Sequence, residues 1–171
     1  MDLELRELTR AFHASPGDHD LRERYLRLQR RVGAHPHYAV LSCVHANLEA
    51  FEAVLRHAQS AGIETLICLG DLVGLGPDPT LVIDRARQRC SICLRGDHDQ
   101  ALIDGPDSDI EANPELRWLR ELLKPRLISS PETRRRWRWL KELPLTHRHA
   151  GAMFAVRPDV LDLGALASWR Q

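Results

Sequence analysis

Cysteine, histidine and aspartate side chains occur at three places in the sequence, each time directly after a short apolar run. The run "YAVLS" leads to Cys43 and His45, "TLICLG" leads to Asp71, and "SICLRG" leads to Asp97, His98 and Asp99. Residues two apart on an extended backbone point to the same side, so the first thiol and imidazole face a common object. Thiolate, imidazole and carboxylate groups bind divalent transition metals, which activate water and hold phosphoryl oxygens. The residue types therefore predict a metal site.

The elements that must position these side chains are alternating strands and helices. Apolar runs predict strands at 38–42, 65–69 and 91–95, and amphipathic patterns predict helices at 47–62 and 78–89 between them. This order is typical of a largely parallel sheet flanked by helices, the α/β class. Ligands of such sheets bind beyond the carboxyl ends of the strands, where all three groups of candidate ligands lie.

Two amphipathic helices precede this part of the chain. Their apolar stripes are formed by Leu3, Leu5, Leu8 and Phe12, and then by Leu21, Tyr25, Leu28 and Val32. We therefore expect an N-terminal helical hairpin over residues 1–36 and one main domain over residues 37–171.

The last third of the sequence carries a weaker pattern. Helices are predicted at 113–124 and 131–143, and a hairpin of two short strands at 151–164. The segment "RRRWRW" interleaves arginine with tryptophan, as a nucleic-acid patch would. On a helix, however, Trp137 and Leu140 face inward with arginines outside, so a core helix with a basic exterior is favoured.

Composition excludes several classes of function. The 171 residues include 24 Lys and Arg and 24 Asp and Glu, so the formal net charge is zero. No overall positive charge attracts the chain to nucleic acid or to an anionic membrane. The start "MDLELRELTR" is acidic, no run is long and apolar enough to span a membrane, and we expect a cytoplasmic protein. The four cysteines fit free thiols of a reducing compartment.

Three segments resemble the motifs of a known family. "LSCVHANLEAFEAVL", "ICLGDLVGLGPDP" and "CLRGDHDQAL" are similar, in order and spacing, to the D-x-H-G-N, G-D-x-x-G-x-G-P-x-P and R-G-N-H-D motifs of calcineurin-like metallophosphoesterases. "WLKELPL" resembles the family's later W-L-x-x-L-P segment. The resemblance implies that the chain forms part of the sheet sandwich of that family. It also implies a site for two metal ions and a phosphoester substrate.

Residue by residue, the resemblance carries over some of the family's site. It makes His45 a metal ligand, Asp71 the carboxylate that bridges the metals, and His98 the histidine that assists the leaving group. Cys43 replaces an aspartate ligand and Asp97 replaces an asparagine ligand, and both retain atoms that bind metal. The implied divalent ion is zinc, manganese or iron.

Later parts of the sequence depart further from the family. The family's V-H-G-S-P segment becomes "FAVRPDV" without histidine, and its closing G-H-T-H motif is absent, which implies a shortened member. His147 and His149 have ligand spacing but precede the final hairpin, so an exposed polar loop is the favoured interpretation for them.

These departures leave alternatives open. We favour a pseudoenzyme whose dinuclear site is eroded, catalytically weak or inactive, which acts as a binding or regulatory module. The alternative is an active metal-dependent phosphatase or phosphodiesterase, and a weaker one is a nucleic-acid-binding protein. We further expect a second copy, a protein partner or the N-terminal helices to cover the incomplete sandwich.

Overall fold

The computed structural model describes residues 3–15, 17–32, 37–149 and 151–157. By its internal contacts the chain divides into two compact units, Met1–His37 and Tyr38–Gln171. The first unit holds two antiparallel helices, α1 (Leu3–Ala14) and α2 (His19–Val32), as the apolar stripes predict. Within the hairpin the rings of Phe12 and Tyr25 stack with centroids 5.2 Å apart.

The second unit is built on a parallel sheet of three strands in the order β1-β2-β3. The strands are β1 (Tyr38–Leu41), β2 (Thr65–Cys68) and β3 (Ile92–Cys93). Val40 lies opposite Ile67, which lies opposite Ile92, so the three strands end at one edge. The predicted α/β class with a parallel sheet is confirmed.

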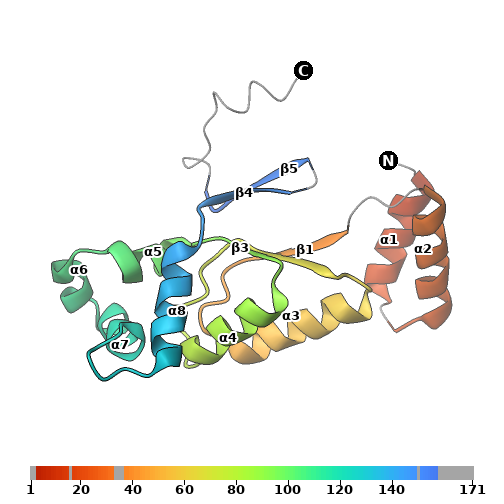
Figure 1. Cartoon of the computed structure of the whole chain (residues 1–171). Helices are drawn as coiled ribbons and strands as arrows, with labels where there is room; N and C mark the ends of the chain where they lie inside the picture. Colours follow the sequence, from red (N-terminus) through yellow and green to blue (C-terminus); the bar gives the residue numbers. More distant parts are fainter. Residues whose placement is uncertain (1–2, 16, 33–36, 150, 158–171) are drawn as a thin grey trace, which may run out of the picture. The chain divides into compact units, whose positions relative to one another are not determined.

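Helices connect the strands and cover one face of the sheet (Figure 1). Helix α3 (Leu48–Ser60) begins at Asn47, whose side chain accepts a hydrogen bond from the backbone of Ala50 at 3.0 Å. Helix α4 (Pro79–Arg89) begins with a proline, which needs no backbone donor in the first turn. Side chains of both helices join the sheet in the core, among them Phe51, Leu55, Val82 and Ile83.

Four further helices follow β3 in the described part of the chain. They are α5 (Asp97–Asp104), α6 (Asp107–Ala112), α7 (Pro114–Leu123) and α8 (Pro131–Glu142). In α8 Leu140 is fully buried, and Trp137 and Trp139 pack against the core, so the prediction of a core helix is confirmed. No helix in the described part of the chain is long and apolar enough to cross a membrane.

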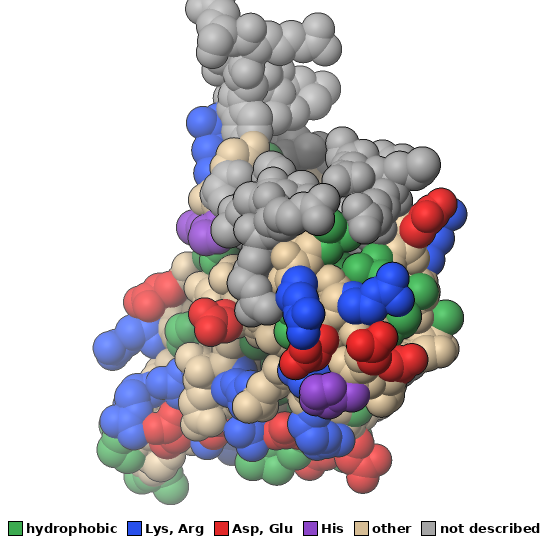
Figure 2. All heavy atoms as spheres, turned by 90° about the vertical axis from the view of Figure 1, so that its right-hand side faces the viewer, with side chains coloured by type: hydrophobic (Ala, Val, Ile, Leu, Met, Phe, Trp, Pro, Cys, Tyr) green, Lys and Arg blue, Asp and Glu red, His purple; other side chains and the backbone are tan. Residues whose placement is uncertain are grey.

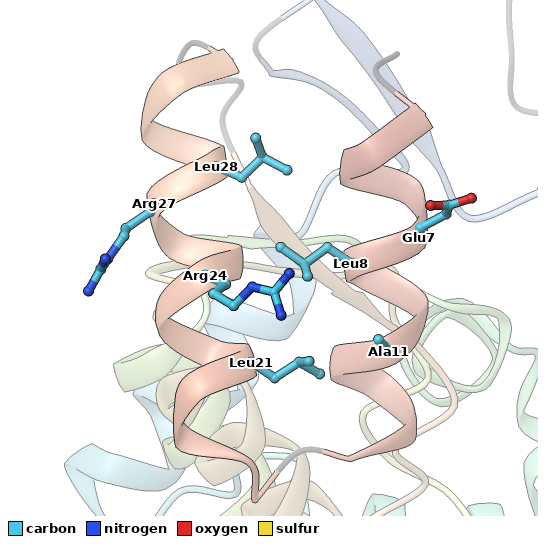
Figure 3. Close-up of a pocket in the computed structure, with 7 residues that line it drawn as sticks. All are labelled: Glu7, Leu8, Ala11, Leu21, Arg24, Arg27 and Leu28. Atoms are coloured by element: carbon cyan, nitrogen blue, oxygen red, sulfur yellow. The ribbon is translucent and has the colours of Figure 1, made fainter.

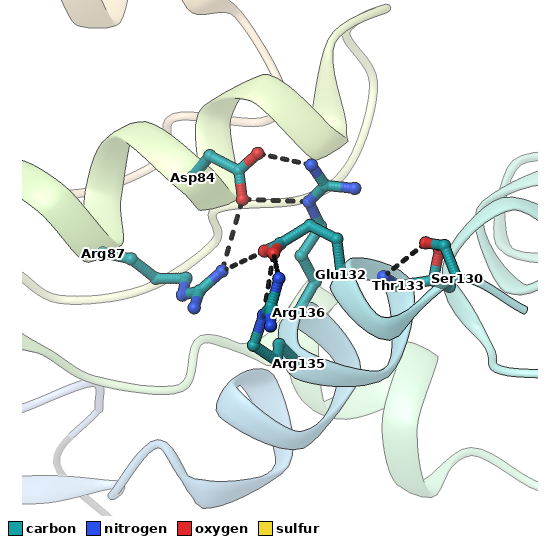
Figure 4. A network of polar contacts seen from close by, with 7 residues as sticks. All are labelled: Asp84, Arg87, Ser130, Glu132, Thr133, Arg135 and Arg136. Carbon is teal, nitrogen blue, oxygen red and sulfur yellow. Dashed lines mark hydrogen bonds and ion pairs between the residues drawn. The ribbon is translucent and has the colours of Figure 1, made fainter.

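Helix α8 is joined to α4 by a network of charged side chains (Figure 4). Arg136 donates two hydrogen bonds to Asp84, and Arg87 contacts both Asp84 and Glu132. Arg135 completes the network by pairing with Glu132 within α8. The arginines of the basic segment are thus partly engaged in holding two helices together.

A two-stranded antiparallel hairpin lies on the other face of the sheet from α3 and α4 (Figure 1). It consists of β4 (Thr146–His149) and β5 (Ala152–Ala155), with Gly151 in the turn at φ +79°. The predicted hairpin at 151–164 includes β5, but β5 pairs with the preceding polar segment "THRH", and residues 158–164 of the prediction lie outside the described residues. Tyr38 contacts the rings of His149 and Phe154, which joins the hairpin to β1.

Candidate metal site

The loops after β1 and β2 bring three potential ligands together. One ligand atom each of Cys43, His45 and Asp71 lies within 4.8 Å of the other two. The thiol of Cys43 is 3.9 Å from Oδ2 of Asp71, and no other such group of three occurs in the described part of the chain. The metal site that the sequence predicts at these strand ends therefore has three of its expected residues in one place.

Unusual backbone conformations produce this arrangement. The backbone angle φ is positive, between +46° and +57°, at Cys43, His45, Ala46 and Asp71. Residues other than glycine rarely adopt this region. Hydrogen bonds hold them there: His45 N donates to Asp71 O, and Ala46 N donates to Leu72 O, both at 2.8 Å. Such backbone conformations cost free energy and persist only where the surrounding structure stabilises them. They occur most often at functional sites.

Asp99 joins the loop that carries Asp71 to the start of α5, the helix that carries His98. Its side chain is fully buried and accepts hydrogen bonds from the backbone N–H groups of Val73 and Gly96 at 3.0 Å and of Leu72 at 3.3 Å. Burial raises the pKa of Asp99, and the three N–H groups oppose that rise. Sequence analysis did not assign Asp99 a role, and its burial is the feature that reveals one.

Glycines make the close approach of these loops possible. A Cβ at Gly96 would lie 2.1 Å from the backbone nitrogen of Asp71, which no side chain could tolerate. A Cβ at Gly74, where φ is +143°, would lie 2.5 Å from Nδ1 of His45 and 3.3 Å from Nδ1 of His98. The absence of a side chain at Gly74 leaves room for the two imidazole rings.

His98 lies beside the three-residue group. Its ring centroid is 4.6 Å from that of His45, and its backbone N–H donates to Oδ1 of Asp71 at 3.0 Å. On its other side, Nδ1 of His98 is 3.8 Å from Oε1 of Glu115, the first-turn carboxylate of α7. This position suits a group that exchanges a proton with a ligand bound at the three-residue group.

Asp97 is placed differently from the other predicted ligands. Its carboxylate forms an ion pair with Arg157 at 2.5 Å, and it does not belong to the three-residue group. Arg157 follows β5, in the segment where the resembling family has a histidine. His147 and His149 lie on β4 and are likewise outside the group. The charge of Asp97 is therefore balanced by a side chain of this protein.

The donor set fits a divalent metal ion. Thiolate, imidazole and carboxylate are groups that supply ligands to tetrahedral zinc sites, where bonds of about 2.0 to 2.3 Å bring the ligand atoms somewhat closer together than the 4.8 Å limit found here. Nδ1 of His45 is buried and has no hydrogen-bond partner among the described residues, so no hydrogen bond competes for that nitrogen.

Comparisons with known proteins agree with this geometry. Residues 36–162 match the family model of the calcineurin-like phosphoesterases, and the chain belongs to that family. The uncharacterized protein MJ0912 of Methanocaldococcus jannaschii is 38% identical over 65 residues, which cover 38% of this chain and 27% of that protein.

Two solved structures are similar in fold. The crystal structure of a metallophosphoesterase from Sphaerobacter thermophilus has a TM-score of 0.51 and 28% identity, over 66% of this chain and 43% of that one. The crystal structure of "a putative diadenosine tetraphosphatase" has a TM-score of 0.50 and 25% identity, over 69% of this chain and 48% of that one. The chain thus spans less than half the length of each of these three relatives.

Proposed function

We propose that this protein is a metallophosphoesterase-like module that binds one divalent metal ion through Cys43, His45 and Asp71 and hydrolyses phosphoesters weakly or not at all. The observation that carries the proposal is the ion pair between Asp97 and Arg157. Where a second metal ion would need the carboxylate, a guanidinium group already neutralises it. Asp97 could act as the predicted metal ligand only by releasing Arg157.

The identity of the metal follows from the ligand atoms. Zinc, manganese and iron all accept imidazole and carboxylate, but a thiolate favours the softer zinc ion. When bound, such an ion would act as a Lewis acid toward a phosphoryl oxygen and lower the pKa of a bound water. The strained loops and Asp99 would hold the ligands in place before the ion binds.

The protein's own side chains would then bind and orient the phosphoester. Arg157 is half-exposed and presents a planar group of donors that suits phosphoryl oxygens. His98 would donate a proton to the leaving oxygen, with Glu115 beside Nδ1 orienting the ring. These roles support recognition of a phosphoester even if turnover is slow.

Slow turnover is expected because each missing charge-stabilising or supporting group lowers the rate or the metal affinity. Removal of one such group lowers activity or affinity by about 10- to 1,000-fold in other enzymes.

The alternative function is an active metal-dependent phosphatase or phosphodiesterase, and the position of His98 next to His45 favours it. A nucleic-acid-binding function has less support, because Arg135 and Arg136 are held in ion pairs.

We also infer that a protein partner or a second copy covers part of the sheet. Val40 lies on β1 with 49% of its surface exposed, although the neighbouring Ala39 and Leu41 pack against the core. An exposed aliphatic side chain on a strand of the parallel sheet supports an incomplete sandwich.

The stoichiometry of metal binding tests the proposal. Wild-type protein should bind one zinc or manganese ion, and Arg157→Ala should bind a second one, because Asp97 becomes available. Arg138→Ala removes an exposed arginine and serves as the control. Hydrolysis of bis-p-nitrophenyl phosphate and of diadenosine tetraphosphate should be slow in all three proteins. Two ions and rapid turnover in the wild type would instead favour the active enzyme.

A further inference from the structure

The helical hairpin has an apolar groove between its two helices (Figure 3). The groove has a volume of about 480 Å³, and its floor is formed by Leu8 and Ala11 of α1 and by Leu21 and Leu28 of α2. These residues lie three and seven positions apart, which is the spacing of a helix face that packs against other helices. The small side chain of Ala11 leaves space that a larger side chain from another helix can fill.

The hairpin has little core of its own. Among its described side chains only Phe12 and Leu28 are buried hydrophobic residues. Helices of 12 and 14 residues are marginal in isolation, and units below about 40 residues usually need a disulfide, a metal or association. The unit Met1–His37 contains no cysteine, so no disulfide stabilises it, and association with further helices is one means of doing so.

Charges around the groove indicate what associates with it. Glu7 lines the groove from α1, with its carboxylate on the side of α1 away from α2, and Arg24 extends from α2 into the space between the helices beside Leu8 (Figure 3). Arg27 is paired with Glu23, but within the described part of the chain neither Glu7 nor Arg24 has an ion-pair partner. One groove thus presents an anion and a cation that are both available.

A two-fold axis through such a groove pairs each anion with the cation of the other copy. We propose that the groove is a dimerisation surface and that two copies of the chain join their hairpins into a four-helix bundle. In this arrangement Glu7 of each copy meets Arg24 of the other, and the leucines of both grooves pack together. A dimer of this kind would bring two candidate metal sites into one particle.

Paired charge reversals test this dimer in the full-length chain. Glu7→Arg gives a groove with two cations, and Arg24→Glu gives a groove with two anions, so each variant should dimerise at least about tenfold more weakly than the wild type. Mixing the two variants should restore dimers, because every cation then faces an anion. Size-exclusion chromatography with light scattering measures the mass, and native mass spectrometry identifies the mixed dimer.

Controls separate the groove from the rest of the hairpin. Arg10→Glu reverses an exposed charge of α1 that does not line the groove, and it should dimerise like the wild type. Circular dichroism should show unchanged helix content, since Glu7 and Arg24 are both exposed. A wild-type protein that is monomeric in solution overturns the proposal. So do single variants that dimerise normally, or mixtures that stay monomeric.

Discussion

Replacing Asp99 by alanine should destabilise the fold, and the hydrogen bonds of Asp99 set the size of the expected loss. In Asp99→Ala, three backbone N–H groups, those of Leu72, Val73 and Gly96, lose the carboxylate that accepts from them. Each buried donor left without a partner costs about 1 to 3 kcal/mol, and removing a buried carboxyl group recovers part of that sum. We expect the free energy of unfolding to fall by about 3 to 5 kcal/mol, a large part of the usual total of about 5 to 15 kcal/mol.

Urea unfolding followed by circular dichroism measures this change. Asp109→Ala is the matched control, because Asp109 is an exposed aspartate in the first turn of α6 and should change stability by less than about 1 kcal/mol. Asp99→Asn should fall between the two, since its amide can accept from Val73 but not from both partners of Oδ2. A loss in Asp99→Ala no larger than that of the control would refute the role assigned to Asp99.

Two further predictions concern the site and the charge network. Gly74→Ala should displace the imidazole of His45 and weaken zinc binding by about 10- to 100-fold, as isothermal titration calorimetry would measure, and unchanged affinity would contradict the close packing. Hydrogen bonds from Arg135 and Arg87 lower the pKa of Glu132. The ionised Glu132 therefore stabilises the fold at pH values above the usual pKa of glutamate, and this stabilisation is lost as the pH falls through the lowered pKa. The stability difference between wild type and Glu132→Gln should therefore shrink on acidification, and a constant difference from neutral to acidic pH would contradict it.

Local sequence pattern was sufficient to predict the sheet and the strand ends. Apolar runs of five residues between amphipathic helices predicted parallel strands, and Asn47 signalled the start of α3. Because the carboxyl ends of such strands share one edge, the convergence of Cys43, His45 and Asp71 was predictable before any coordinates.

Contacts between distant segments were not predictable in the same way. The ion pair of Asp97 with Arg157 and the burial of Asp99 depend on how loops pack, and no local periodicity encodes them. The positive φ angles of Cys43 and His45 were also unexpected, since neither residue type favours that conformation. Strand β4 was not predicted because it is polar and lacks an apolar alternation, whereas β5 lies within the predicted range.

The central claim is that Cys43, His45 and Asp71 bind one divalent metal ion. The most direct test is isothermal titration of metal-free protein with zinc, on wild type, on Cys43→Ser and on His45→Ala. Cys90→Ser is the control, because it removes a thiol outside the group. We predict one zinc ion per chain for wild type and control, an affinity at least about tenfold lower for Cys43→Ser, and no specific binding for His45→Ala. Equal binding by all four proteins, or none by the wild type, would contradict the account.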